Sequence, residues 1–325
     1  MSLTYPEAVV VGALQGVSEL FPVSSLGHAV LVPALVGGRW AADLDVSAPE
    51  SPYLAFIVGL HVATALALIV FYRRDWFRIV RGLVVSLRSR QVTTPEARLG
   101  WLLVLATIPV GITGLALEHL FRTTLGRPIP AAAFLVVNGA VLLVGERLRR
   151  REPVDAVPVA VPAEQVTAGG TGPVPAGDGA LVARQDGEGD DGPAAEVTLA
   201  GLRARDAFVI GASQSLALLP GISRSGVSMV TGLVRGLTHE EAARFSFLLA
   251  TPVILAAGVL KLPDLFGPLG DGVRGQVLAG SVASFVTAYG AVRWLTRWFQ
   301  TRTLTPFAIY CLVAGAFSLI VLVVR

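Results

Sequence analysis

The sequence predicts an all-α polytopic membrane protein, with six transmembrane helices and two re-entrant helical hairpins in an inverted-topology repeat. Composition is the first reason: of 325 residues, 53% are hydrophobic and 15% charged, whereas a soluble domain carries about 25% charged residues. The mean hydropathy of +0.67 agrees. Apolar stretches of bilayer-spanning length are the second reason, and two interrupted stretches that resemble each other are the third. This composition excludes a soluble enzyme and an intrinsically disordered chain.

Six stretches approach the roughly 20 apolar residues that a spanning helix needs: residues 53–72, 100–120, 130–146, 243–262, 276–296 and 306–324. Two more, residues 5–36 and 206–236, are long enough but are broken near the middle by Pro, Ser and Gly beside ionisable groups. Such breaks are tolerated at membrane depth only where the backbone is buried in protein or lines a wet cavity. We therefore expect both to be re-entrant helical hairpins.

Arginine in the connecting segments predicts the orientation, because cytoplasmic loops carry the excess of basic residues. Seven arginines lie in the loop between residues 73 and 98, four follow the third span at 147–151, and three end the penultimate span at 293–302. All three counts agree with one threading. The first hairpin then enters from outside, the second enters from the cytoplasm, and both termini lie outside.

The chain divides into a first membrane repeat (residues 1–151), a flexible cytoplasmic linker (152–200) and a second membrane repeat (201–325). The linker contains no aromatic residue, six Pro, eight Gly and an acidic run at 186–191. Such a segment cannot bury enough apolar surface to offset the entropy lost on ordering. We expect it to have no catalytic role.

An internal repeat connects the two interrupted stretches. A shift of 199 residues superimposes four residues of one on the same residue types of the other: Gln15 on Gln214, Leu20 on Leu219, Ser24 on Ser223 and Gly27 on Gly226. The copies enter from opposite faces, and inverted repeats place their polar site near the midplane where interrupted segments meet. We therefore look for the site at the two hairpins.

The first hairpin carries the motif LQGVSELFPVSSLGH. Gln15 and Glu19 are four residues apart and share a helix face, the proline after them ends that helix, and Ser24 or Ser25 can cap the next one. His28 lies on the face of Ser25. The serines can be simple caps and His28 a core histidine. Glu19 is different, since an ionisable group within a membrane segment is functional by default.

The second hairpin carries LLPGISRSG, in which Ser223 and Ser225 flank Arg224 after a Pro-Gly break. An arginine at membrane depth needs a partner, and its fork of donors matches a carboxylate or a phosphate. One alternative is a permanent ion pair with Glu19. The other is an anion site, most naturally for phosphate, made by Arg224, the hydroxyls and the helix-start amides.

The remaining polar residues give weaker signals. His61 and His119 lie alone in apolar stretches and His239 lies on a solvated helix start, so we expect none of them to act in the site. Cys311 has no second cysteine to pair with. No metal-site spacing, Walker motif or dinucleotide motif is present, and no basic stripe suggests nucleic acid.

Both motifs are similar to those of the undecaprenyl-diphosphate phosphatase family, the integral membrane enzymes also called bacitracin-resistance proteins. The resemblance continues through FSFLLATP (residues 245–252) and PFAIY (306–310), so it covers essentially all of the chain except the linker. It implies hydrolysis of undecaprenyl diphosphate to undecaprenyl phosphate and phosphate. This reaction recycles the lipid carrier for cell-wall peptidoglycan at the outer side of the bacterial cytoplasmic membrane and confers bacitracin resistance.

The resemblance also implies residue roles. Ser25 matches the nucleophile, Glu19 the essential acid and ligand of a diphosphate-bound Mg²⁺ (or Ca²⁺), His28 the motif histidine and Arg224 the phosphate-binding arginine. The expected phosphate contacts are Gln15, Ser24, Ser223, Ser225 and Gly226. Gln15 stands where many members carry Glu; because an amide cannot act as a base, Glu19 must carry more of that task.

Several alternatives remain open. Ser25 can form a covalent intermediate, with Glu19 taking its proton directly or through His28, or water can attack directly while Ser25 only binds phosphate. The rival class is a secondary transporter or flippase of a phosphorylated lipid, which shares inverted repeats and broken helices. The sequence also leaves open whether the chain forms a homodimer.

Overall fold

The computed structural model describes residues 3–44, 52–120, 125–149, 198–199, 201–267 and 272–324. Within these ranges the regular structure is helical, without strands. The helices are α1 (Tyr5–Leu20), α2 (Ser25–Val36), α3 (Gly38–Asp43), α4 (Pro52–Phe71), α5 (Arg73–Ser89), α6 (Pro95–Leu120), α7 (Pro128–Arg149), α8 (Ala204–Ser213), the 3-10 helix η2 (Gln214–Leu218), α9 (Arg224–Val234), α10 (His239–Phe266), α11 (Arg274–Trp298) and α12 (Thr305–Val324). Residues 152–197, most of the expected linker, lie outside the described ranges.

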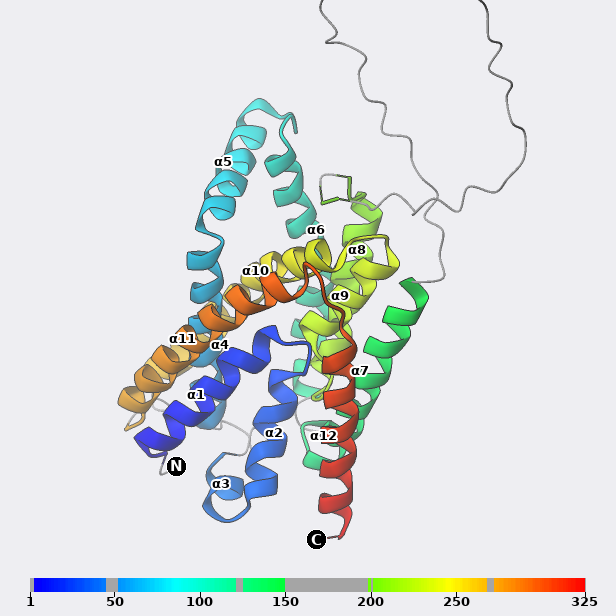
Figure 1. Ribbon diagram of the computed structural model, residues 1–325. Coiled ribbons are helices and arrows are strands. Elements are labelled where there is room, and N and C mark those ends of the chain that lie inside the picture. The colour runs from blue at the N-terminus through cyan, green and yellow to red at the C-terminus, as the bar shows by residue number, and fades with distance from the viewer. Residues whose placement is uncertain are drawn as a thin grey trace, which may run out of the picture.

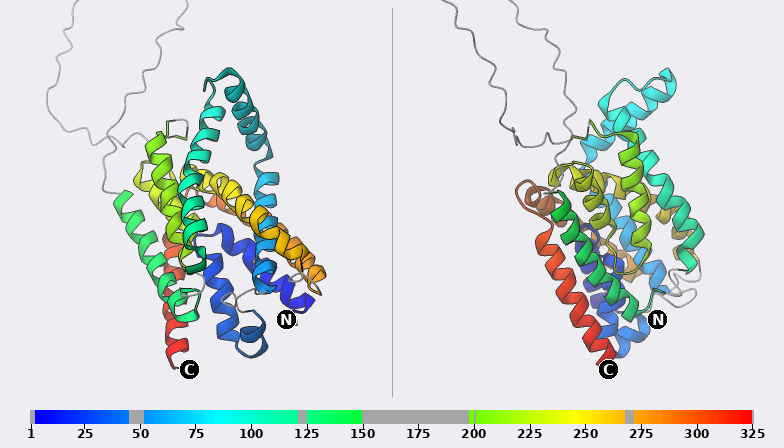
Figure 2. Two further views of the ribbon diagram at one scale, coloured as in Figure 1. Left: turned by 180° about the vertical axis from the view of Figure 1, so that it is seen from behind. Right: turned by 90° about the vertical axis from the view of Figure 1, so that its right-hand side faces the viewer.

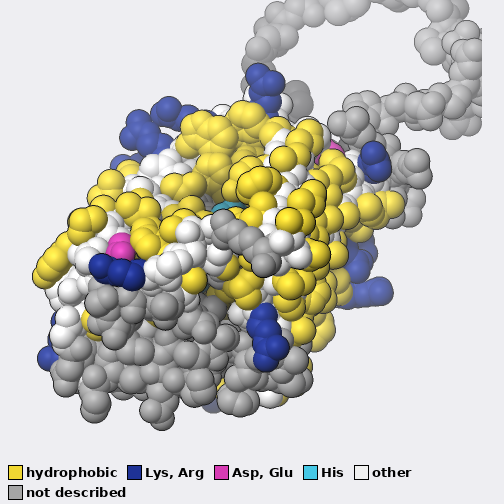
Figure 3. All heavy atoms as spheres, turned by 90° about the horizontal axis from the view of Figure 1, so that it is seen from below, with side chains coloured by type: hydrophobic (Ala, Val, Ile, Leu, Met, Phe, Trp, Pro, Cys, Tyr) yellow, Lys and Arg dark blue, Asp and Glu magenta, His cyan; other side chains and the backbone are white. Residues whose placement is uncertain are grey.

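Five helical segments are long and apolar enough to cross a membrane: Pro95–Leu117, Pro128–Arg149, His239–Gly258, Arg274–Trp298 and Thr305–Val324. The α4–α5 pair, bent by 87°, brings the number to six if it is counted as one span. Large apolar side chains point outward, as with Leu115 (76% exposed) and Ile320 (65%), and hydrophobic atoms dominate the described surface in Figure 3. The prediction of an all-α polytopic membrane protein is confirmed.

The arginine-rich segment predicted to be a loop is instead helix α5. Its buried face packs on the start of α6, where Gly82 lies against Ala97, and the indole Nε1 of Trp101 donates to Ser86 Oγ over 2.9 Å. The two helices project from one end of the molecule, opposite to the end where both termini lie (Figure 1). The many arginines made this segment resemble a loop, because the buried residues of α5 form only a narrow stripe along the helix.

Helix α1 ends at the predicted break. Phe21, which precedes a proline, is extended (φ −66°, ψ 142°), as expected from the clash of the proline ring with a helical neighbour. Ser24 then caps α2 by accepting from the Gly27 amide at 3.2 Å. Its φ of 69° is unusual for a residue with a side chain.

The second break repeats this arrangement. The chain passes from α8 through η2 to an extended Leu219, which also precedes a proline. Gly221 follows with φ +108°, a conformation that glycine adopts without steric cost. Ser223 caps α9 by accepting from the Gly226 amide at 3.1 Å. Both interrupted segments are therefore pairs of helices joined by short turns, and Figure 2 shows them from two further sides.

Small residues hold the first hairpin against α11. Gly12 and Gly16 of α1 face the backbone of Gly280 and Ser284, so close that a Cβ atom on either glycine would collide. Close approach through small residues is the usual way in which helices associate inside membranes. In the second hairpin, Gly211 packs in the same way on the α6 backbone at Ala106.

The α1–α11 contact makes a testable prediction. A Cβ on Gly280 would lie 2.8 Å from Phe56 Cε2 and 2.9 Å from the Ala8 carbonyl oxygen. Gly280→Val should therefore lower the free energy of unfolding by about 2 kcal/mol through overpacking. Gly290→Val is the matched control, because nothing lies within 4 Å of its Cβ position on the same helix. Thermal unfolding in detergent checks both; equal melting temperatures would contradict the packing argument.

Candidate active site

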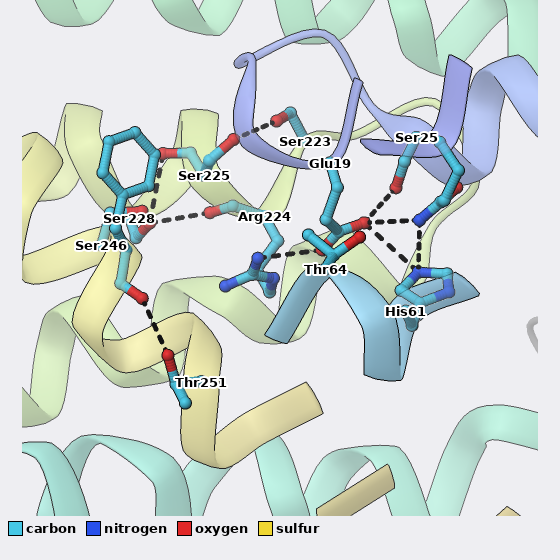
Figure 4. Close-up of polar contacts among 12 residues, drawn as sticks. Glu19, Ser25, His61, Thr64, Ser223, Arg224, Ser225, Ser228, Ser246 and Thr251 are labelled. Carbon is cyan, nitrogen blue, oxygen red and sulfur yellow. Dashed lines mark hydrogen bonds and ion pairs between the residues drawn. The ribbon is translucent and has the colours of Figure 1, made fainter. Parts of the chain in front are cut away.

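Glu19 is buried at the centre of a polar cluster whose other members are buried or partly buried. Its Oε2 accepts from Ser25 Oγ at 2.5 Å and from Gln15 Nε2 at 3.1 Å, and lies 3.2 Å from His61 Nε2. Its Oε1 accepts from Arg224 Nη2 at 2.9 Å. We call these five residues the Glu19 cluster. Figure 4 shows Glu19 between Ser25, His61 and Arg224.

Four helices supply the cluster. Gln15 and Glu19 stand on one face at the end of α1, Ser25 is the first residue of α2, His61 lies in α4, and Arg224 is the first residue of α9. Because Pro22 ends α1 and the chain turns back at once, the carboxylate of one helix meets the hydroxyl at the start of the next. The two interrupted segments therefore meet, and each contributes part of the cluster.

Arg224 is only partly satisfied by Glu19. Its Nη2 donates to the carboxylate, while its Nη1 is buried and has no hydrogen-bond partner. An unpaired buried donor costs free energy unless a ligand or water satisfies it. Arg224 thus forms the ion pair with Glu19, and its second terminal nitrogen, Nη1, remains available to donate to an anionic oxygen.

Ser24 joins the tips of the two hairpins. Its Oγ accepts from the Gly27 amide in its own hairpin and from the Gly221 amide in the other, both at 3.2 Å. A Cβ on Gly27 would lie 2.9 Å from Gly221 Cα, so the two backbones touch. Phosphate contact by Ser24 remains a prediction.

Ser223 and Ser225 bond to each other across 3.0 Å. Ser223 Oγ also accepts from the Gly226 amide, and Ser225 Oγ donates to the Phe21 carbonyl of the first hairpin at 3.1 Å. Both serines are almost fully buried. They stabilise the tip that carries Arg224, and a role for them or for Gly226 in binding phosphate also remains a prediction.

Asn138, the one asparagine of the sequence, clamps the two tips from α7. Its Nδ2 donates to the Pro22 carbonyl at 3.0 Å, and its Oδ1 accepts from the Ser223 amide at 2.9 Å. The side chain is 0% exposed. Sequence reasoning missed this residue, although an amide in the middle of an apolar span was the available signal.

His28 lies outside the Glu19 cluster. Its Nδ1 donates to the Ser24 carbonyl at 2.8 Å, and its Nε2 accepts from the Tyr310 hydroxyl at 2.7 Å. Ser25 therefore contacts Glu19 directly and not through His28. A catalytic part for His28 remains a prediction.

His61 corrects an expectation. It is not alone in an apolar environment, because its Nε2 lies 3.1 Å from Gln15 Nε2 and 3.2 Å from Glu19 Oε2. Like Glu19, His61 is an ionisable group within an apolar segment, which is functional by default, so the sequence carried the same signal for both residues. His239 instead contacts Glu146 and Arg149, and the His119 side chain lies outside what the structure describes.

No metal cage is visible in the described parts of the chain. Among those residues, no three His, Cys, Asp or Glu side chains are grouped to hold an ion. In the Glu19 cluster the one carboxylate is already in contact with a hydroxyl, an amide, an imidazole and a guanidinium. Any cation at this site must therefore take most of its ligands from elsewhere.

The clamp by Asn138 can be tested with a side chain of similar size. Asn138→Leu leaves the Pro22 carbonyl and the Ser223 amide buried without this partner, which should lower the free energy of unfolding by about 3 kcal/mol. Thr296→Val is the control, because that hydroxyl bonds only to carbonyls of its own helix. Thermal unfolding in detergent measures both changes. If Asn138→Leu melts with the control, the clamp does not stabilise the tips.

Comparison with known proteins agrees with the two motifs. The model of the family "Bacitracin resistance protein BacA" matches residues 8–317. A protein of Mycolicibacterium paratuberculosis named undecaprenyl-diphosphatase is 65% identical over 99% of both chains. Undecaprenyl-diphosphatase 1 of Frankia casuarinae is 56% identical over 98% of both chains, and an undecaprenyl-diphosphatase of Acidiphilium cryptum is 40% identical over 97% of both. The resemblance inferred from the sequence is confirmed, and the chain belongs to the bacitracin resistance protein BacA family.

Proposed function

We propose that this protein hydrolyses undecaprenyl diphosphate to undecaprenyl phosphate and inorganic phosphate in the bacterial cytoplasmic membrane, recycling the cell-wall lipid carrier. One observation carries the proposal. The Ser25 hydroxyl is hydrogen-bonded to the buried Glu19 carboxylate, which also pairs with Arg224, and Arg224 keeps one donor nitrogen without a partner. A hydroxyl paired with a base suits phosphoryl transfer, whereas transport of the same anion needs no nucleophile. The names of the relatives support the identity of the lipid.

Ser25 is the proposed nucleophile and Glu19 its base. The Ser25 O–H bond breaks toward Glu19 Oε2, 2.5 Å away, while Ser25 Oγ forms a bond to the terminal phosphorus. The bridging P–O bond breaks and its electron pair leaves with undecaprenyl phosphate. Water then cleaves the phosphoseryl group and releases phosphate. The competing route has no covalent step, and water attacks directly while Ser25 binds phosphate.

Arg224 and the hairpin tips are proposed to stabilise the charge that develops on the phosphoryl oxygens, because such stabilisation usually accounts for most of the rate enhancement in phosphoryl transfer. The buried Nη1 of Arg224 has no hydrogen-bond partner in the protein and can donate to a phosphoryl oxygen. The proposed phosphate site is completed by Gln15, Ser24, Ser223, Ser225 and Gly226. His28 is proposed as a further catalytic residue. Their existing hydrogen bonds suggest that several act by holding the tips in place.

We further propose that a divalent cation, Mg²⁺ or Ca²⁺, binds together with the diphosphate of the substrate. Mg²⁺ is commonly held by one or two carboxylates together with substrate phosphates, which fits a cluster that has Glu19 as its single carboxylate. When bound, the cation would neutralise charge on the diphosphate. Glu19 would provide the ligand from the protein.

The proposed membrane arrangement is six spans and two re-entrant hairpins in inverted repeats of residues 1–151 and 201–325, joined by a flexible cytoplasmic linker at 152–200. The packing of Gly12 on α11 and of Gly211 on α6, related by the same shift of 199, supports the repeat. The termini lie at one end and α5 projects at the other (Figure 1), which agrees with the arginine counts. The site would then open to the extracytoplasmic side.

The reaction can be tested on protein purified in detergent, as phosphate release from undecaprenyl diphosphate with and without Mg²⁺. Glu19→Gln should lower kcat about 10³-fold by removing the base, and Arg224→Ala about 10²-fold by removing a charge-stabilising donor. Arg235→Ala is the matched control, because Arg235 pairs with Asp206 at 3.3 Å away from the cluster. It should keep the wild-type rate.

No release from folded, lipid-binding wild-type protein would overturn the phosphatase and favour a lipid transporter. Trapping a phosphoenzyme that Ser25→Ala lacks would establish the covalent route. A competent enzyme that forms no such adduct would favour direct attack by water.

Orientation is tested by cysteine labelling of intact bacteria. Val36 at the end of α2 and Leu87 on α5 are 59% and 63% exposed, and the single native cysteine is buried. A membrane-impermeant maleimide should label Val36→Cys in intact cells, and Leu87→Cys only after permeabilisation. The reverse pattern would invert the proposed threading.

A further inference from the structure

Helix α5 exposes a row of large apolar side chains. Phe77, Val80 and Val84 follow one another at intervals of three and four residues, so they lie on one side of the helix, and all three are exposed. We call them the apolar stripe. Gly82, which packs on α6, is two residues before Val84 and therefore points to roughly the opposite side of the helix. The apolar stripe thus faces away from α6.

Arginines form a second row beside the first. Arg74, Arg78 and Arg81 are spaced by four and three residues and are exposed. None of them forms an ion pair with any residue that the structure describes. The one acidic residue of α5, Asp75, accepts from Arg244 Nη2 of α10 at 2.9 Å. The three arginines, which we call the arginine stripe, therefore keep their charge for an external partner.

The contacts of α5 place it at the level where α6 enters the membrane. The contact of Gly82 with Ala97 and the hydrogen bond of Trp101 to Ser86 both involve the first two turns of α6. Those turns belong to the apolar segment Pro95–Leu117, which is long enough to cross a bilayer. Trp101 is itself exposed, and tryptophan is enriched at membrane–water interfaces. Helix α5 thus packs at the boundary of the bilayer.

The direction of α5 agrees with a place along that boundary. Helix α4 has 20 residues without Asp, Glu, Lys or Arg, which is enough to cross the bilayer. Helix α5 is bent by 87° from α4 and lies at one end of the molecule (Figure 1). A helix that turns in this way at the end of a crossing helix runs along the bilayer surface.

We propose that α5 is a binding site for anionic lipids, with its apolar stripe among the acyl chains and its arginine stripe on the phosphate headgroups. An apolar row beside a basic row is the pattern of helices that lie in the membrane interface, and guanidinium groups match phosphate oxygens. The last turn leaves the surface for water, because residues 87–91 include only one apolar residue, Leu87. No residue of the Glu19 cluster takes part.

Charge also favours lipid over a second copy of the chain as the partner of this surface. Two copies related by a twofold axis would bring the same surface patches together, and with them two arginine stripes. Neither stripe has a carboxylate to offer the other, since Asp75 is already paired with Arg244. Anionic lipid provides the opposite charge and the apolar environment in one partner.

The position of α5 is tested with a bimane fluorophore on Val84→Cys or Val85→Cys in lipid vesicles. These neighbours are 41% and 47% exposed, but Val84 belongs to the apolar stripe and Val85, four residues after Arg81, lies on the arginine side. The single native cysteine is buried. Lipids with brominated acyl chains should quench the Val84 probe more strongly, and acrylamide in water should quench the Val85 probe more strongly.

The preference for anionic lipid is tested with the Val84 probe. Half-quenching should require about fivefold less brominated phosphatidylglycerol than brominated phosphatidylcholine, and high salt should weaken this preference. The triple variant Arg74→Gln, Arg78→Gln and Arg81→Gln should lose it. The matched control removes the same charge from the end of α11, by Arg293→Gln, Arg297→Gln and Arg302→Gln, and should keep it.

Three results would overturn the proposal. The first is a Val84 probe quenched by acrylamide and not by brominated lipid, which would place the apolar stripe in water. The second is a Val84 probe that neither reagent quenches, which would show that a protein partner or a second copy covers it. The third is equal quenching by the two brominated lipids, or a preference that survives in the variant without the arginine stripe.

Discussion

The pairing of Glu19 with Arg224 is the constraint on which the rest of the site depends. A carboxylate and a guanidinium inside a membrane protein each lose the hydration of water, and one without the other would be an uncompensated buried charge. The two groups come from helices 205 residues apart in sequence. The fold must therefore hold α1 and α9 in contact, and the glycine contacts with α11 and α6 and the clamp by Asn138 serve that end.

The two hairpins share a backbone design but not a chemistry. Under the shift of 199, Ser25 corresponds to Arg224, and each is the first residue of the helix after a turn. One copy presents a hydroxyl at this position and the other presents a cation. Glu19 corresponds to Leu218, so the second hairpin has no carboxylate at this position. The division gives a single polar centre with an acceptor on one side and a donor on the other.

Local patterns in the sequence were sufficient for most of the elements of the fold. Spans follow from lengths of apolar sequence, and the breaks at Pro22 and Pro220 follow from steric rules that concern adjacent residues. The helix α5 was missed, because its existence depends on packing against α6 and not on its own composition. The contact between Glu19 and Ser25 could be anticipated, since the two residues are six positions apart across one turn.

Apart from the ion pair of Glu19 with Arg224, which the charges of the two hairpins offered as one alternative, contacts between distant residues could not be anticipated in the same way. His61 is 46 residues from Gln15, Asn138 is 85 residues from Ser223, and Tyr310 is 282 residues from His28. Helical periodicity shows which side chains share a face, but not which face of another helix they meet. A single polar residue inside an apolar span indicates that some partner exists, and only the fold identifies it.

The contact of Ser24 with Gly221 has a consequence for how the protein is made. Ser24 has a backbone conformation that residues with a side chain rarely adopt. Its hydroxyl accepts hydrogen bonds from two amides, and one of them belongs to the other hairpin. The ribosome makes the chain from its N-terminus. The first half therefore enters the membrane before the Gly221 amide, the partner of Ser24, and Arg224, the partner of Glu19, have been made. The Glu19 cluster is thus completed only after residue 224 has been inserted, so a truncated first half carries the carboxylate and the hydroxyl of Ser25 but lacks the guanidinium that pairs with the carboxylate.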